Sequence, residues 1–253
     1  MTRTSAFPPR VIAFGDLEAG VWGAGWWSQE AFAAIGVVGA VPLTMTPAAT
    51  LDGADAGEEW RLEGDGVQLV FAPAADAVRH PGADRELGGF DQLCRVRGTI
   101  VVDGAQRPVA SLGRRSSRTA PYDPGRFESL RDVSGWYEPG EGVVISSLRP
   151  RRARGHGDDV ITATLLEPGL APPVSDPRLS TTYTAAGEPA RMTLELWLDS
   201  DEEAGRYPRR AAGEAMGSRA VASLGGLEFH ADLLRCHSRG LEGAGVYLLI
   251  RSE

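Results

Sequence analysis

Residues 178–199 read Arg-Leu-Ser-Thr-Thr-Tyr-Thr-Ala-Ala-Gly-Glu-Pro-Ala-Arg-Met-Thr-Leu-Glu-Leu-Trp-Leu-Asp, and this stretch predicts two β-strands joined by a short turn. In its second half apolar and polar side chains alternate, which is the pattern of a strand with two different faces. Ala186-Gly187 with Pro189 supplies residues that are typical of turns. The apolar positions of the second strand are Met192, Leu194, Leu196 and Leu198.

The register of this hairpin follows from matching the apolar faces of its two strands. Pairing Tyr183 with Met192 brings these faces together. The same register sets Arg178 opposite Trp197, where a cation–π contact can form. We therefore expect a β-rich container with one apolar face and one sparsely polar face.

The composition is that of a folded protein, with 253 residues, 42% hydrophobic and 24% charged. A formal net charge of -8 and a pI of about 5.1 exclude nucleic acid as the main partner, because neutralising phosphates requires a basic surface. Neither lysine nor asparagine occurs in the chain. A lysine Schiff base, a Walker lysine and an N-glycosylation sequon are therefore excluded.

No pattern in the chain predicts export or a disulfide framework. Cys94 and Cys236 lie in separate strand-like runs, which is typical of buried thiols in a cytosolic protein. Residues 1–10 lack the apolar core of a signal peptide. The most apolar segment, residues 31–43, is interrupted by glycine and proline and is shorter than the ~20 residues of a membrane helix. We expect a cytoplasmic protein without a membrane span, and its oligomeric state stays open.

Short strand-like runs, separated by turns rich in glycine and proline, extend over most of the chain. Examples are Val67–Phe71 and Gln92–Val102, and Asp103-Gly104 marks a tight turn after the second of these. We expect an all-β fold, because a parallel sheet would need intervening helices.

Some segments depart from this pattern. Residues 29–35 and 124–131 have a short helical periodicity. Residues 113–127 are rich in arginine and proline and predict a long surface loop or lid. The clearest linker in the chain consists of Pro168-Gly169 and Pro172-Pro173. We therefore expect an N-terminal β domain of residues 1–170 and a C-terminal barrel portion of residues 171–253.

Residues 20–27 place Trp22, Trp26 and Trp27 among three glycines. Glycine lets a backbone or a ligand approach closely, and tryptophan adds a wide apolar surface with one polar group. Two interpretations stay open, namely a core with a bent strand or one wall of a binding cavity.

Four stretches resemble the carotenoid hydratase (hydroxyneurosporene synthase)-like family, also called AttH-like: Gly98–Gly104, Leu112–Arg115, Arg178–Asp199 and Leu241–Tyr247. Members of this family have lipocalin-type β-barrels, usually two in tandem, and related lipocalin-like enzymes catalyse Diels–Alder cyclisations. The resemblance implies a lipocalin-like (calycin-type) antiparallel barrel, as two tandem barrels or as barrel halves. Where many relatives carry a His-Ser-Trp-Gly-like segment, this chain reads Arg-Arg-Ser-Ser-Arg-Thr after Gly113, so chemistry that needs that histidine or tryptophan is not expected.

Hydration or cyclisation of a polyene needs an acid, apolar walls and aromatic faces that stabilise positive charge. Acidic candidates on or near strands are Asp16, Glu195 and Glu214, with Asp232 as a fourth. Glu195 and Glu214 can instead be ion-paired structural residues. An arginine beside Glu195 would favour its ionised form and weaken it as a proton donor.

The histidines show no spacing that is typical of metal ligands, and no Gly-x-Ser-x-Gly elbow occurs. We therefore expect neither a metal nor another cofactor. The four histidines are His80, His156, His230 and His237.

Two functions remain. The first is an enzyme that converts a hydrophobic polyene or terpenoid-like substrate by cyclisation, a pericyclic reaction or hydration. The second is a non-catalytic lipocalin-like carrier of a small lipophilic ligand. The resemblance favours the enzyme. In both cases the residues expected to contact the ligand are Trp22, Trp26, Trp27, Trp136, Tyr183, Trp197 and Tyr247.

Overall fold

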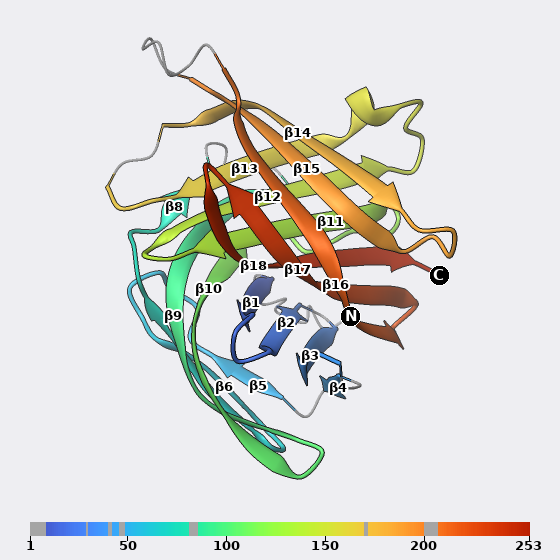
Figure 1. The fold of residues 1–253 in the computed structure, drawn as a ribbon. Helices are drawn as coiled ribbons and strands as arrows, with labels where there is room; N and C mark the ends of the chain where they lie inside the picture. Colours follow the sequence, from blue (N-terminus) through green and yellow to red (C-terminus); the bar gives the residue numbers. More distant parts are fainter. Residues whose placement is uncertain are drawn as a thin grey trace.

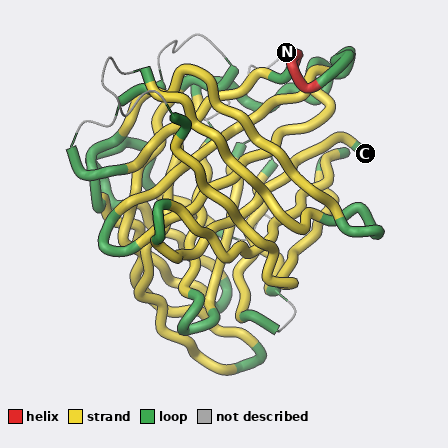
Figure 2. Tube along the Cα trace, turned by 45° about the horizontal axis from the view of Figure 1, so that its top comes forward, coloured by secondary structure: helices red, strands yellow, loops and turns green. Residues whose placement is uncertain are grey.

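The computed structural model describes residues 9–28, 30–39, 42–45, 49–80, 86–169, 172–199 and 207–253. Almost all regular structure in these ranges is β-strand (Figures 1 and 2), and the one helical element among them is a short 3₁₀ turn, η1 (His156–Asp158). The all-β prediction is confirmed. None of these described segments forms a helix that is long and apolar enough to cross a membrane.

Two antiparallel sheets form the molecule, one from each half of the chain. The first sheet contains β1 (Arg10–Asp16), β2 (Val21–Trp27), β3 (Ala31–Val37), β4 (Leu43–Met45), β5 (Thr50–Asp52), β6 (Trp60–Gly64), β7 (Val67–Pro73), β8 (Val78–Arg79), β9 (Gly89–Val102) and β10 (Ala105–Arg118). The second contains β11 (Phe127–Tyr137), β12 (Glu141–Pro150), β13 (Val160–Leu166), β14 (Val174–Tyr183), β15 (Pro189–Leu198), β16 (Arg209–Leu224), β17 (Leu227–Ser238) and β18 (Leu241–Ser252).

The strand orders explain the shape in Figure 1. In the first sheet the order is β4-β3-β2-β1-β10-β9-β7-β6-β5, with β8 paired to β9, and the sheet curves into a half-barrel. The order β13-β12-β11-β18-β17-β16-β15-β14 closes the second sheet almost completely, because its two end strands lie next to each other.

The chain passes from the first sheet to the second at residues 119–126. The domain boundary predicted between residues 170 and 171 lies outside the described residues and stays a prediction.

Strand alternation divides the core into three apolar layers. One face of the first sheet, with Leu93 and Leu112, packs against the outer face of the barrel, with Val246 and Leu248. The opposite face of the first sheet lines the half-barrel's own core. The interior face of the second sheet, with Met192 among others, fills the barrel. A polar side chain buried in any of these layers is costly unless it is hydrogen-bonded.

Three local predictions from the sequence are wrong. Residues 29–35 and 124–131 contribute to β3 and β11, not to helices. Both strands are buried on their two faces over most of their length, so the period-2 signal is lost. The predicted loop at 113–127 is wrong over residues 113–118, because β10 continues to Arg118 and its arginines are buried, whereas residues 119–126 do form a connection.

The hairpin of β14 and β15 keeps the predicted faces but not the predicted register. Met192 and its alternate neighbours are buried as expected, yet Met192 pairs with Thr181 and Arg178 lies opposite Glu195. The turn between the strands is closed by Thr184, and a bulge follows Thr182, which together shift the pairing by two residues. The predicted cation–π contact still forms, because Arg178 and Trp197 are diagonal neighbours on the two strands, with the guanidinium carbon of Arg178 5.9 Å from the Trp197 ring centroid.

A glycine on β9 is required by close backbone approach. Gly98 has φ 146, and a Cβ built there would lie 1.9 Å from the backbone oxygen of Gln68 on β7. Gly98→Ala is expected to lower the free energy of unfolding by more than about 2 kcal/mol, because the strands must separate to admit the methyl group. Urea denaturation measures this change. Gly140→Ala is the control, since nothing lies within 4 Å of its added Cβ; equal destabilisation by both variants would contradict the account.

Candidate functional site

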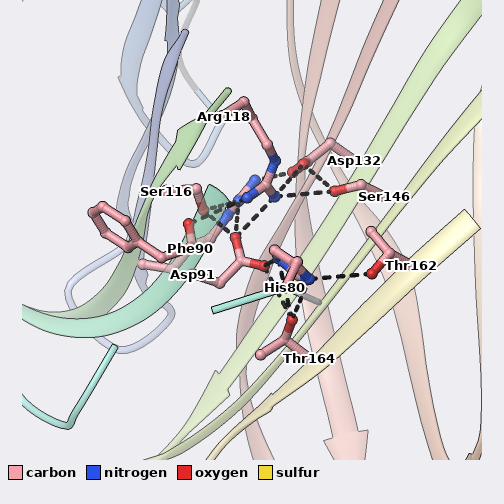
Figure 3. Close-up of polar contacts among 10 residues, drawn as sticks. His80, Phe90, Asp91, Ser116, Arg118, Asp132, Ser146, Thr162 and Thr164 are labelled. Atoms are coloured by element: carbon pink, nitrogen blue, oxygen red, sulfur yellow. Dashed lines mark hydrogen bonds and ion pairs between the residues drawn. The ribbon is translucent and has the colours of Figure 1, made fainter. Parts of the chain in front are cut away.

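Polar side chains interrupt the apolar layer between the two sheets (Figure 3). On the first sheet, Arg114, Ser116 and Arg118 alternate along β10 and therefore share the face that meets the barrel. Ser116 pairs with Asp91 of β9, which brings Asp91 to the same face. All four side chains are almost fully buried.

The face of the barrel that packs against the first sheet carries a second row of polar side chains. Asp132 on β11 pairs with Ser146 on β12, and Ser146 pairs with Thr162 on β13. Thr164 follows two residues later on the same face. This row crosses three neighbouring strands and faces β9 and β10, as Figure 3 shows.

Asp91 is the centre of the cluster. Its Oδ1 accepts hydrogen bonds from the Ser116 hydroxyl and from the Arg118 guanidinium, the latter at 2.8 Å. Its Oδ2 lies 2.6 Å from Nε2 of His80 and accepts a further bond from the Thr164 hydroxyl at 3.2 Å. Both carboxylate oxygens are thus fully used, which is what keeps a buried carboxylate tolerable.

Asp132 supplies the second negative charge, from the other sheet. Arg114 donates to its Oδ1, and the Ser146 hydroxyl donates to its Oδ2 at 2.8 Å. Arg118 lies 3.8 Å from the same Oδ2. Two guanidinium groups and two carboxylates therefore form one buried ion-pair network that crosses the boundary between the sheets.

The network fixes the charge states of its members. Burial by itself raises the pKa of Asp91, but Arg118, His80 and Arg114 outweigh it and hold the pKa well below the ordinary value. Burial lowers the pKa of Arg114 to about 9, so this guanidinium is still charged at neutral pH. The charges of the two arginines and the two aspartates balance each other.

His80 joins the network to a cavity. Its side chain is 6% exposed, and its Nδ1 lies 3.1 Å from the Thr162 hydroxyl. The ring stands directly after β8, where the His80 amide donates to the backbone oxygen of Gly89. With Nε2–H donated to the ionised Asp91, Nδ1 is the ring nitrogen left to exchange protons, and it faces the Thr162 hydroxyl.

The cavity beside His80 has a volume of about 840 Å³ and is called here the interface cavity. Its wall comes from residues 76–80, from the edge strand β13 and from the start of β14. Aliphatic side chains such as Val78 and Ile161 form most of this wall. Thr162, Thr164 and His80 supply hydroxyl and imidazole groups, and Asp76 and Arg79 add a carboxylate and a guanidinium group. A mostly apolar cavity with a few converging polar groups is the usual form of a small-molecule site.

The structure does not bring the predicted catalytic carboxylates together. Asp16 accepts backbone hydrogen bonds from residues 18 and 19 in the β1–β2 turn. Glu195 forms an exposed ion pair with Arg210 at 3.1 Å. Glu214 lies 3.8 Å from Arg191, also exposed. None of the three lines the interface cavity.

The predicted ligand-binding aromatics are dispersed over several layers. Trp22, Trp26 and Trp136 belong to the layer between the sheets, where Trp22 donates to Ser218 at 2.8 Å and Trp136 donates to the backbone oxygen of Gly15 at 3.1 Å. The indole N–H groups of Trp22 and Trp136 thus connect the two sheets. The remaining four are Trp27 in the half-barrel core, Tyr247 in the barrel core, Trp197 beside Arg178, and Tyr183, which is 50% exposed.

Sequence reasoning missed the cluster around His80 and Asp91. The available signal was the alternation of Arg114, Ser116 and Arg118, which is that of a strand with a polar face. Within the described part of the chain, no three His, Cys, Asp or Glu side chains gather in a way that could hold a metal ion.

Comparisons with known proteins give the fold. No family model and no curated protein sequence matches the chain. Among solved structures, an AttH from Nitrosomonas europaea superposes with a TM-score of 0.65 at 10% identity, covering 97% of this chain and 92% of that chain. The chain shares its lipocalin-like fold.

Two further structures have the same arrangement. CghA bound to Sch210972 gives a TM-score of 0.63 at 10% identity over 98% of this chain and 89% of that one. Kievitone hydratase from Nectria haematococca gives 0.59 at 9% identity, again over 98% and 89%. The predicted lipocalin-like antiparallel fold is confirmed.

The variant Asp132→Asn tests how much the ion-pair network stabilises the folded protein. Asp132→Asn is expected to lower the free energy of unfolding by about 3–5 kcal/mol, because it removes the carboxylate that accepts from Arg114 and leaves the buried network with one excess positive charge. The matched control is Glu195→Gln, which breaks an exposed ion pair and should cost less than about 1 kcal/mol. Denaturation curves measure both, and a loss below about 1 kcal/mol in Asp132→Asn would contradict the account.

The lowered pKa of Asp91 predicts how the stability of the protein changes in acid. Because its pKa is lower in the folded than in the unfolded protein, its stabilisation is complete above about pH 4 and is lost as the pH falls from there toward the folded pKa. Asp91→Asn should be less stable at pH 7 and should lose less further stability between pH 5 and pH 3 than the unmodified protein. Denaturation at these pH values measures both effects; identical acid profiles would refute them.

Proposed function

We propose that the protein is a cofactor-independent enzyme that hydrates a carbon–carbon double bond of a hydrophobic polyene or terpenoid-like substrate in the interface cavity. One observation carries this proposal. A histidine held by a buried, ionised aspartate lines a largely apolar cavity, with the other ring nitrogen directed at hydroxyl groups of the wall. This is the arrangement of a positioned general base and acid.

Hydration can be written with all atoms balanced. The oxygen of water bonds to one carbon of the double bond, and a proton bonds to the other carbon. Nδ1 of the protonated His80 ring gives a proton to one carbon of the double bond, and water bonds to the carbocation that forms at the other carbon. The added water then returns a proton to Nδ1, directly or through the Thr162 hydroxyl, so that the imidazolium is restored at the end. Asp91 stabilises this imidazolium and keeps Nε2 protonated.

The cavity and the network have distinct roles in this chemistry. The aliphatic wall excludes stray water and strengthens electrostatic interactions within the site. Arg114 and Arg118 keep Asp91 ionised, so Asp91 acts as a positioning residue and does not become the proton donor. The hydroxyl groups of Thr162 and Thr164 can orient the attacking water beside Nδ1.

The structural neighbours support a small-molecule reaction on this fold. One is named as a hydratase, that of kievitone, and another is a complex with the compound Sch210972. Their low identity to this chain leaves the substrate to be found by experiment.

His80→Gln tests the proposal, because glutamine keeps hydrogen-bonding groups but cannot shuttle a proton. Incubation with a panel of polyenes and prenylated compounds, followed by mass-resolved chromatography, should detect a gain of one water. The variant should lower the rate by about a hundredfold or more while binding is retained. His237→Gln, at an exposed histidine of β17, is the matched control and should leave the rate unchanged.

Other outcomes would overturn the proposal in different ways. A product of unchanged mass, formed equally by His80→Gln, would indicate a cyclisation or pericyclic reaction governed by shape. Retention of ligands without any product from the whole panel would indicate a carrier.

A further inference from the structure

The interface cavity is elongated, because consecutive residues border it. Residues 160–165 of β13 all lie on its wall. Successive side chains of a strand point to opposite faces, so six residues in a row can border one cavity only where the cavity runs along the edge of the strand. Among the described strands β13 pairs only with β12, and its other edge borders the cavity. This edge measures about 17 Å from Val160 to Leu165.

The opposite wall comes from the first sheet and has the same form. Residues 76–80, which include β8, all border the cavity as well. β8 is antiparallel to β9, and the His80 amide donates to the backbone oxygen of Gly89. Residues 87 and 88 of the wall therefore continue it beyond His80, on the side away from Asp76. At the spacing of a strand, His80 is about 13 Å from Asp76 and about 7 Å from residue 87.

Contacts between the two walls fix their relative direction. Thr164 of β13 donates to Asp91 of β9 at 3.2 Å. Two residues further along both strands, a Cβ added to Gly142 would lie 3.2 Å from Leu93 and 3.4 Å from Leu166, so these two residues also lie close together. The residue numbers of β9 and β13 therefore increase in the same direction, whereas those of β8 increase in the opposite one.

Each end of the cavity thus combines residues from both sheets. Val160 and residues 87 and 88 form one end, and Leu165 and Asp76 form the other. The two walls run side by side between these ends, which gives the cavity the shape of a channel along β13.

His80 lies between the two ends. Its Nδ1 is 3.1 Å from the Thr162 hydroxyl and 3.4 Å from the Thr164 hydroxyl, and Figure 3 shows the ring beside both threonines. From the midpoint between these threonines, the edge of β13 extends about 10 Å to Val160 and about 7 Å to Leu165. The cavity therefore continues on both sides of the group that exchanges protons.

This position of His80 decides which double bond of a substrate can react. A linear hydrocarbon fits an elongated, mostly aliphatic cavity lengthwise, and it buries the most apolar surface when it fills the cavity on both sides of His80. A chain whose terminal double bond lies at His80 can fill one side only and loses the hydrophobic contribution of the other. The shape of the cavity favours a double bond in the interior of the chain.

We propose that the enzyme hydrates an internal double bond of a long linear polyene or terpenoid, whose chain extends past His80 in both directions. This inference rests on the proposed hydratase function and adds the position of the reaction to it. The bonds that form and break are those of the hydration itself. His80 gives a proton to one carbon of the internal double bond, and the oxygen of water bonds to the other carbon.

Geranylgeraniol tests the position of the reaction, because it carries terminal and internal double bonds with the same alkyl substitution. Mass-resolved chromatography identifies products that have gained one water, and NMR locates the new hydroxyl group. The expected result is an excess of internal over terminal hydration of about tenfold or more. The same analysis applies to every compound of the panel that contains both kinds of double bond.

Two results would overturn the inference, and they can be told apart. Hydration mainly at the terminal double bond would refute the internal position but leave the hydratase function in place. No gain of water by any compound of the panel would refute both.

Bulky substitutions at the two ends of the cavity test the same point through kinetics. Val160→Trp and Asp76→Trp each place a large ring at one end, at exposed positions where the fold should tolerate it. Each variant should lower kcat/KM for geranylgeraniol by about tenfold or more, mainly through a higher KM. A loss in only one of the two variants would show that the chain occupies one side of His80 and would overturn the inference.

Val101→Trp is the matched control for these variants. Val101 of β9 is as exposed as Val160, at 37% each, but lies outside the cavity wall. The control should leave kcat/KM unchanged, and a loss equal to that of Val160→Trp would contradict the role given to the ends of the cavity.

Discussion

The structure depends on an ion-pair network that is buried where two curved sheets meet. Asp91 and Arg118 pair within the first sheet, whereas Asp132 of the barrel is neutralised by Arg114 and Arg118 only when the sheets are packed together. Removing one member leaves an unpaired charge in an apolar layer, which is far more costly than losing an exposed ion pair. The network therefore couples the correct packing of the two halves to the placement of the His80 ring.

This coupling explains why a polar site can exist inside an apolar interface. Large apolar side chains around the cluster, together with the indole bonds from Trp22 to Ser218 and from Trp136 to Gly15, hold the sheets in one arrangement. A rigid surrounding of this kind keeps His80 oriented without help from a ligand. The interface cavity then opens beside a ring whose hydrogen bond to Asp91 is already formed.

The sequence predicts those features that depend on neighbouring residues. The alternation along β15, the two-faced strand at residues 92–102 and the tight turn at Asp103-Gly104, whose φ values are 52 and 74, follow from strand periodicity and turn chemistry. The lipocalin-like fold followed from a resemblance at glycine and turn positions. Strands that are buried on both faces, such as β3, lack that periodicity and were mistaken for helix.

The candidate site depends on partners that are distant in the sequence, which is why it could not be predicted. Arg114 and Arg118 suggest a solvated loop until Asp91 and Asp132 are known to neutralise them. His80 follows a strand of only two residues, and nothing near it in the sequence marks it as a neighbour of β13. Glu195 was predicted to lie beside an arginine, and the observed register sets Arg178 opposite it, but Glu195 pairs with Arg210 of β16 while Arg178 pairs with Asp176.

The most direct test of the central claim is to follow a proton from solvent to the substrate carbon beside His80. Turnover of a converted polyene in D₂O, analysed by mass spectrometry and NMR, would locate the deuterium. The account predicts one solvent deuterium on the carbon next to the newly hydroxylated one, with formation of this product strongly reduced in His80→Gln. A product without carbon-bound deuterium, or equal labelling and rate in the variant, would contradict it.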